Sequence, residues 1–223
     1  MLVAAAAALG AVRADDYYYG VNTPPRTVIV GIDLSLSNPL IEDDAFAAKV
    51  AARIGQMIQG LAPHSRVSLR SFASYDSAAN AALTFDTEIA PKTAPSEQIA
   101  RFISTVVAGV PKLVRRGKVH AQGMTNIIAF LDNMAATVDC RAQPATVILA
   151  SDGVEDSKLA NLSHGRGTLP MPDRPIFAGC DQLVILGLAQ GIRDPRETQR
   201  LRDEWSQWSQ TAGFKSFTGL NDW

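Results

Sequence analysis

Hydrophobic positions along the chain form two alternating patterns from residue 27 onward: short apolar runs and helical stripes. Runs that are apolar on both faces are typical of strands buried inside a parallel sheet, and strict alternation of polar and apolar residues indicates a half-buried strand. The predicted strands are Thr27–Ile32, Arg66–Phe72, Ala81–Phe85, Thr146–Ala150, Leu183–Leu186 and Phe214–Thr218.

Between these runs, apolar residues recur at steps of three and four, which predicts amphipathic helices. Asp43 or Asp44 is expected to cap the first helix, and Asp194, followed by Pro195 and Glu197, to cap the last. The stripes are Ala47, Val50, Ile54, Ile58 and Leu61; Ile99, Phe102, Ile103, Val106, Val107 and Val110; the run Ile127–Ala135; and Leu201, Trp205, Trp208 and Ala212.

Strands that alternate with helices in this way predict an α/β fold. We expect a doubly wound, mostly parallel six-stranded sheet with helices on both faces and one short antiparallel edge strand. At 223 residues with 47% hydrophobic content, the chain has the size and composition of one globular domain, which we place at residues 26–223.

The N-terminal segment has the features of an export signal. Met1–Leu9 is apolar and rich in alanine, and it is followed by Ala11-Val12-Arg13-Ala14, with small residues where a signal peptidase recognises its substrate, and then by the polar pair Asp15-Asp16. The apolar run is shorter than the roughly 20 residues that span a bilayer. We therefore expect a signal peptide at residues 1–14, a linker at 15–25, and export to the periplasm or the extracellular space; a buried N-terminal helix is the alternative.

The two cysteines fit an exported protein. In an oxidising compartment an isolated pair of cysteines usually closes a disulfide, so we expect Cys140 and Cys180 to be joined. Because the chain has no CxxC motif and no histidine near either cysteine in the sequence, a zinc site is not expected. Both cysteines precede predicted strands, which places the expected disulfide at the amino-terminal edge of the sheet.

The balance of charge excludes some classes of partner. Lysine and arginine number 21 against 22 aspartate and glutamate residues, a formal net charge of −1. Proteins that bind nucleic acid or anionic membranes through bulk electrostatics carry a strongly basic surface. Neither kind of partner is therefore expected.

Polar residues with oxygen atoms are found where predicted strands end and a predicted helix begins. An aspartate and two serines, spaced by two, follow the first strand; a threonine precedes the helix at Ile127; and an aspartate follows the strand that ends at Ala150. Ligands of open α/β sheets bind beyond the carboxyl ends of the strands, where the strand order reverses. Oxygen ligands of this kind suit Mg²⁺, Mn²⁺ or Ca²⁺. The candidate metal-binding residues are Asp33, Ser35, Ser37, Thr125 and Asp152.

The pattern Asp-x-Ser-x-Ser, then a loop threonine, then a strand-end Asp-Gly resembles the metal-ion-dependent adhesion site of von Willebrand factor A domains. The resemblance covers roughly residues 26–218, including the order of strands and helices. It implies that Ser35, Ser37 and Thr125 bind the ion directly and that Asp33 and Asp152 act mainly through water. It also implies that the ion keeps an open coordination position for a carboxylate of a partner protein.

The function that this resemblance implies is metal-dependent protein binding, without catalysis. Two alternatives are a metal-dependent hydrolase of phosphate esters and a scaffold subunit of an envelope or secretion assembly that works without metal. The hydrolase is disfavoured because no nucleophile–base pair, phosphate-binding glycine-rich loop or catalytic histidine is evident in the sequence.

Residues that flank the candidate site are expected to have structural roles. Asn38 and Gly153 are expected to shape its loops, and Glu155 and Asp156 to be solvated loop acids; the alternative is that these two acids add carboxylates to the rim of the site. The crossover between Asp152 and Leu183 is long and rich in glycine and proline, and Glu155 to Leu162 is its only part whose sequence is compatible with a helix. Long irregular loops are often functional.

Overall fold

The computed structural model describes residues 23–74, 80, 82–163 and 167–223. The predicted signal peptide and residues 15–22 of the predicted linker lie outside the described residues. No helix in the described part of the chain is long and apolar enough to cross a membrane. The elements are β1 (Thr27–Asp33), the 3₁₀ helix η1 (Pro39–Ile41), α2 (Asp44–Ile58), β2 (Arg66–Phe72), β3 (Thr84–Glu88), α4 (Ser96–Ala108), α5 (Val110–Arg115), α6 (Ile127–Ala135), β4 (Ala145–Ala150), β5 (Gln182–Leu186), α7 (Pro195–Ala212) and β6 (Ser216–Leu220).

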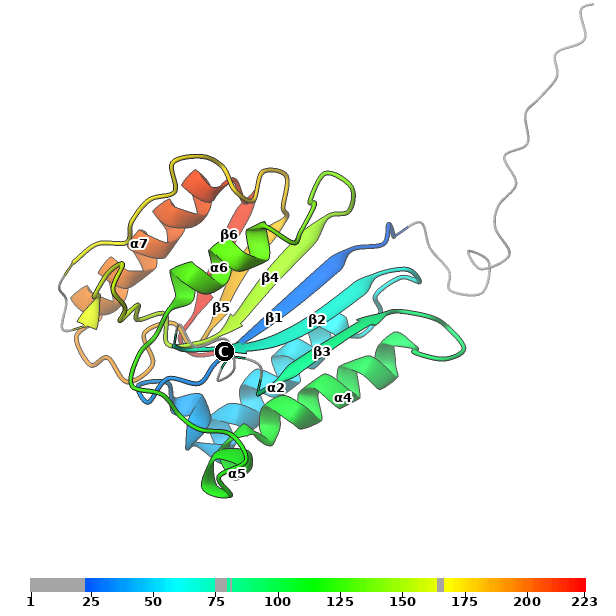
Figure 1. Ribbon diagram of the computed structural model, residues 1–223, viewed down its shortest axis with the longest axis horizontal. Helices are drawn as coiled ribbons and strands as arrows, with labels where there is room; N and C mark the ends of the chain where they lie inside the picture. Colours follow the sequence, from blue (N-terminus) through cyan, green and yellow to red (C-terminus); the bar gives the residue numbers. More distant parts are fainter. Residues whose placement is uncertain (1–22, 75–79, 81, 164–166) are drawn as a thin grey trace, which may run out of the picture.

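The strands form one six-stranded sheet in the order β3-β2-β1-β4-β5-β6 (Figure 1). All neighbouring pairs are parallel except β2 and β3, which are antiparallel. This arrangement confirms the predicted mostly parallel α/β sheet with one short antiparallel edge strand. The strand order reverses between β1 and β4, because the chain builds β1, β2 and β3 on one side and then continues with β4 on the other.

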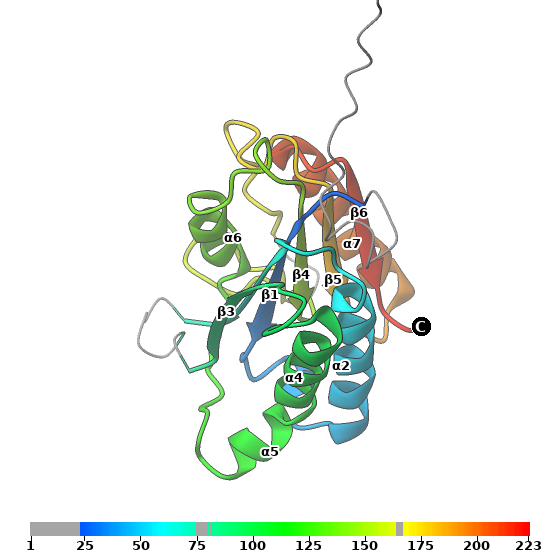
Figure 2. The ribbon, with the colours of Figure 1, turned by 90° about the vertical axis from the view of Figure 1, so that its right-hand side faces the viewer.

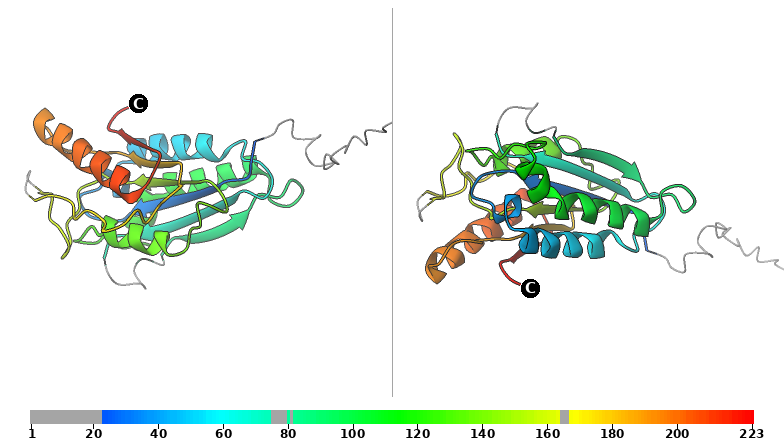
Figure 3. Two further views of the ribbon diagram at one scale, coloured as in Figure 1. Left: turned by 90° about the horizontal axis from the view of Figure 1, so that it is seen from above. Right: turned by 90° about the horizontal axis from the view of Figure 1, so that it is seen from below.

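Successive residues of β1 face opposite sides of the sheet, and each side is covered by helices. Val28, Val30 and Ile32 pack with α2 and α4 in one core cluster, whereas Ile29 packs with α6 and α7 in the other. Figure 2 shows α2 and α4 on one side of the sheet and α6 on the opposite side, and α2 and α4 lie side by side in both views of Figure 3. Both faces of β1 and β4 are thus buried, which explains their continuous apolar sequences.

Local signals determine where the helices begin and end. Asp43 caps α2, accepting hydrogen bonds from the backbone N–H groups of Ala45 and Phe46 at 2.8 and 2.9 Å. Asp194 caps α7 in the same way, and Gly213 ends that helix with a φ of 95°, which favours glycine. These caps agree with the sequence-based predictions.

Some predicted elements differ from the structure. The strand predicted at 81–85 is found at Thr84–Glu88 and that predicted at 214–218 at Ser216–Leu220. The helix predicted through Val110 is divided into α4 and α5. The helix considered at 155–162 does not form: its backbone makes isolated bridges between Asp156 and both Thr125 and Asn161.

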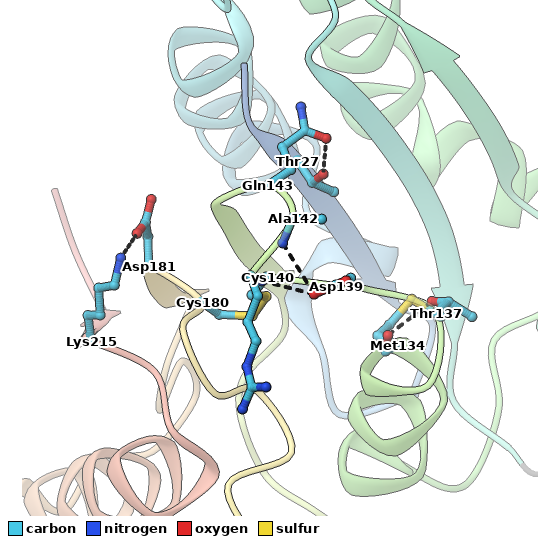
Figure 4. The surroundings of a disulfide bond; sticks show 11 residues. Thr27, Met134, Thr137, Asp139, Cys140, Ala142, Gln143, Cys180, Asp181 and Lys215 are labelled. Atoms are coloured by element: carbon cyan, nitrogen blue, oxygen red, sulfur yellow. Dashed lines mark hydrogen bonds and ion pairs between the residues drawn. A yellow bond between two sulfur atoms is a disulfide. The ribbon is translucent and has the colours of Figure 1, made fainter. Parts of the chain in front are cut away.

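The predicted disulfide between Cys140 and Cys180 is present, with a Cα–Cα distance of 4.9 Å and a sequence separation of 40 (Figure 4). Cys140 lies in the segment that leads into β4, and Cys180 lies just before β5. Because these strands are parallel neighbours, the bond joins their amino-terminal ends. The carboxyl ends of β1 and β4, where the candidate metal-binding residues are located, lie at the opposite edge of the sheet.

Candidate metal site

Three loops carry the candidate metal-binding residues. The first loop (residues 33–38) begins at the last residue of β1, the second loop (residues 120–126) leads into α6, and the third loop (residues 151–156) follows β4. The segments that leave β1 and β4 lie at the same end of the sheet in Figure 1. The first loop contributes Asp33, Ser35 and Ser37, the second Thr125, and the third Asp152.

Backbone hydrogen bonds join the second loop to each of the other two. The Gln122 N–H donates to the Leu34 carbonyl at 2.9 Å, and the Leu36 N–H donates to the Gln122 carbonyl at 2.8 Å. On its other side, Thr125 exchanges two backbone hydrogen bonds of 3.0 Å with Asp156. The second loop is therefore held between the first and the third.

Asp33 is fully buried at the end of β1. The pairing of Ile32 with Ala150 places the next residues, Asp33 and Ser151, side by side. Ser151 donates its hydroxyl hydrogen to Asp33 Oδ2 at 2.6 Å, and the Ser35 N–H donates to Asp33 Oδ1 at 2.9 Å. Both carboxylate oxygens are thus oriented by residues of two different loops.

Asp152 is connected to the first loop through the two serines. The hydroxyl oxygens of Ser35 and Ser37 are 3.2 Å apart, and the Ser37 hydroxyl lies close enough to Asp152 to lower the pKa of its carboxyl. Asp152 Oδ1 also accepts a hydrogen bond from the Val154 N–H at 2.9 Å. Four of the five predicted residues therefore form one chain of contacts, and Thr125 is placed beside the third loop by its backbone.

The two buried aspartates have raised pKa values. Burial raises the pKa of the Asp33 carboxyl to about 7, and the negative charge of Asp152 adds to this increase. Burial also raises the pKa of Asp152. Among the ion pairs between described residues, none includes either aspartate. Two carboxylates that are buried together without a basic partner favour the binding of a cation.

The pH dependence of the metal-free protein tests the protonation of Asp33. Its pKa rises from 3.8 to about 7 in the folded chain. The folded state then binds more protons than the unfolded state between these values, so stability decreases as the pH rises from about 4 to about 7. We expect a smaller decrease in Asp33→Asn than in the wild type, measured by urea unfolding in EDTA. Parallel curves would contradict the raised pKa.

The donor set fits a hard divalent cation. Carboxylate and hydroxyl oxygens are ligands that Mg²⁺, Mn²⁺ and Ca²⁺ accept, whereas zinc prefers histidine and cysteine. Within the described residues, no group of three or more histidine, cysteine, aspartate or glutamate side chains is arranged to hold a metal ion. A metal at these three loops would accordingly depend on hydroxyl groups as well as on the two aspartates.

Comparisons with known proteins give similarity in structure only. No protein-family profile matches the sequence, and no curated protein sequence matches it significantly. One similar structure is the pilus adhesin SpaC from Lactobacillus rhamnosus GG in an open conformation (12% identity, TM-score 0.47, covering 91% of this chain and 28% of the adhesin). Another is a second form of the same adhesin (14% identity, TM-score 0.49, covering 90% of this chain and 29% of the adhesin).

A third similar structure is an aerotolerance-related membrane protein from Bacteroides fragilis NCTC 9343 that carries multiple mutations to serine (14% identity, TM-score 0.45, covering 88% of this chain and 92% of that protein). This chain spans less than a third of the length of the adhesin. With TM-scores below 0.5, none of these similarities bears on function.

Two residues, Asn38 and Ser151, make hydrogen bonds at the site that the sequence did not predict. Asn38 Nδ2 donates to the Asp33 carbonyl at 2.8 Å and to the Ala150 carbonyl at 3.1 Å, which joins the ends of β1 and β4. This agrees with its expected role in shaping the loops. Ser151 hydrogen-bonds to Asp33 as described above, and only the pairing of β1 with β4 reveals this contact.

Glu155 corrects a prediction. It was expected to be a solvated loop acid, but its side chain is fully buried. Its Oε2 accepts hydrogen bonds from the backbone N–H groups of Ile127 and Ile128 at 2.7 and 3.1 Å, at the start of α6. A helix N-terminus offers unpaired N–H groups and a partial positive charge, which together stabilise a buried carboxylate.

Gly153 is held in a conformation that only glycine adopts easily. Its φ is 74°, and an added Cβ would lie 2.5 Å from Leu188 Cδ1 and 3.1 Å from Trp205 Nε1. The indole N–H of Trp205 also donates to the Gly153 carbonyl at 2.7 Å. We expect Gly153→Ala to lower the free energy of unfolding by about 2–4 kcal/mol, because backbone strain and steric overlap add. Urea unfolding measures this change.

Gly117→Ala is the matched control for this substitution. Gly117 also has a positive φ, 63°, but an added Cβ would meet nothing within 4 Å. We expect this variant to lose only about 1 kcal/mol, the cost of the backbone conformation. Equal losses in the two variants would contradict a steric role for the packing around Gly153.

Proposed function

We propose that this chain is a von Willebrand factor A-type module that binds a divalent cation and, through it, an acidic group of a partner protein outside the cytoplasm. The observation that carries the proposal is that Asp33 and Asp152 are buried beside each other and near serine hydroxyls. Among the described residues, neither aspartate forms an ion pair with a basic side chain. The residues proposed to hold Mg²⁺, or Mn²⁺ or Ca²⁺ in its place, are Asp33, Ser35, Ser37, Thr125 and Asp152.

The five proposed residues supply two kinds of oxygen atom, charged and neutral. Asp33 and Asp152 supply negative charge from buried positions, while Ser35, Ser37 and Thr125 supply neutral oxygens. A site with this few charged oxygens leaves a bound divalent cation with positive charge, which attracts a carboxylate. Ser37 is solvent-exposed, whereas Asp33 and Ser35 are buried, so a partner would approach from the side of Ser37.

Metal binding is tested by isothermal titration calorimetry of the chelator-treated protein with Mg²⁺ and Mn²⁺. We expect one site, and we expect Ser35→Ala to bind at least about 10-fold more weakly because a neutral oxygen is lost. A wild-type protein that binds neither ion at millimolar concentration would contradict the proposal.

Partner binding is tested with the Mn²⁺-loaded protein. Mn²⁺ enhances the relaxation of protons in the water bound to it, so a carboxylate that displaces this water reduces the enhancement. We expect acetate or a short aspartate-containing peptide to reduce it, and acetamide at the same concentration to leave it unchanged. An equal response to acetate and acetamide would contradict coordination of an acidic group.

The same protein preparation distinguishes the other functions considered from the sequence. Hydrolysis of p-nitrophenyl phosphate that requires Mg²⁺ and is lost in Asp33→Ala would favour a metal-dependent hydrolase. An assembly with other envelope proteins that persists after chelation would favour a scaffold subunit that works without metal.

A further inference from the structure

Glu155 joins the third loop to the start of α6. Its Oε2 accepts the two N–H groups of Ile127 and Ile128, and its Oε1 accepts the hydroxyl hydrogen of Ser157 at 2.5 Å. Helix α6 has no side-chain cap of its own, because Asn126 at the N-cap position instead donates its Nδ2 to the Ala73 carbonyl. The carboxylate of Glu155 therefore takes the place of the missing cap.

The neighbouring residue strengthens the same connection. Asp156 exchanges two backbone hydrogen bonds of 3.0 Å with Thr125. Thr125 is thus paired with Asp156, and the two N–H groups that bind Glu155 follow it closely along the chain. Four hydrogen bonds, two at each of these residues of the third loop, fix the start of α6 against the segment that carries Asp152.

We propose that Glu155 is a positioning residue for the metal site, which sets the place of Thr125 relative to Asp152 without binding the metal itself. This inference rests on the proposed function. Glu155 follows Asp152 closely along the chain, so a shift of the helix start away from Glu155 would move Thr125 away from Asp152. Residues that orient metal ligands in this way typically change metal affinity by about 10- to 100-fold when they are replaced.

The test separates the geometry of Glu155 from its charge. Glu155→Gln keeps the length of the side chain and an oxygen that can accept from Ile127 and Ile128, but it removes the charge. Glu155→Asp keeps the charge but shortens the side chain by one methylene group. We expect Glu155→Gln to bind Mn²⁺ within about 3-fold of the wild type, and Glu155→Asp and Glu155→Ala to bind it about 10- to 100-fold more weakly.

The measurement is calorimetric titration with Mn²⁺, made on each variant after circular dichroism has established that it is folded. If Glu155→Ala does not fold, the comparison of Glu155→Asp with Glu155→Gln still decides. Asp156→Asn is the matched control, since Asp156 is the adjacent, half-buried acid and its carboxylate accepts from Asn161 at 2.7 Å. We expect this control to bind Mn²⁺ like the wild type.

Each other outcome overturns the inference in a recognisable way. Weak binding by Glu155→Gln with normal binding by Glu155→Asp would make the charge of Glu155, or direct coordination, the important property. Normal Mn²⁺ affinity in all three folded variants would make Glu155 only a helix cap. Failure of the proposed function itself is different, because the wild-type protein would then not bind Mn²⁺.

Discussion

Asp33→Asn should abolish the stabilisation of the protein by Mg²⁺ and at the same time leave the metal-free protein as stable as the wild type or more stable. Asp33 lies at the centre of the contacts between the first and third loops, and its carboxylate is buried beside that of Asp152. A ligand at 100 times its Kd stabilises a folded protein by about 2.7 kcal/mol. We expect this gain in the wild type and none in the variant.

The side chain of asparagine can preserve the local hydrogen bonds. Its oxygen can accept from the Ser35 N–H, and its amide can donate to the Ser151 hydroxyl oxygen in place of the bond that Asp33 accepts. The substitution therefore removes a buried negative charge with little change of shape. Thermal unfolding in Mg²⁺ and in EDTA measures both effects, and an equal gain from Mg²⁺ in the two proteins would contradict the assignment of Asp33.

The fold was predictable because its signals are local. The bounds of β2 and α6 agree with the predicted Arg66–Phe72 and Ile127–Ala135, since periodicity and neighbouring turns define them. The edge strand β3 begins later than predicted. Its residues alternate between exposed and partly buried, so hydrophobic pattern defines it weakly, and its register depends on pairing with β2.

The proximity of the candidate residues could be predicted from the sequence, but the hydrogen bonds that join them could not. Asp33 and Asp152 could be placed together because strand order reverses between β1 and β4, a property of doubly wound sheets. The burial of Glu155 could not be predicted, because it depends on the orientation of Asn126 toward Ala73, which leaves the start of α6 without a cap of its own. No local pattern around Glu155 distinguishes it from a solvated loop acid.

Removal of the disulfide should destabilise the protein without changing its metal affinity. Cys140 and Cys180 are 40 residues apart, and in the chain-entropy model a cross-link across a loop of this length stabilises by about 4 kcal/mol. We expect the double variant Cys140→Ala/Cys180→Ala to lose about this amount in urea unfolding. Alanine is preferred to serine because Cys180 is fully buried and a hydroxyl there would need a hydrogen-bond partner.

Reduction of the wild-type protein provides an independent measurement of the same effect. Dithiothreitol should lower the stability of the wild type toward that of the double variant and should leave the variant unchanged. The disulfide joins the amino-terminal ends of β4 and β5 (Figure 4), whereas Asp33 and Asp152 lie at the carboxyl ends of β1 and β4. Mn²⁺ affinity at a temperature where the variant remains folded should therefore stay within about 2-fold of the wild type. A large loss of Mn²⁺ affinity in the double variant would show that the two edges of the sheet are coupled. Equal stability of the oxidised and reduced wild type would contradict a stabilising role for the disulfide.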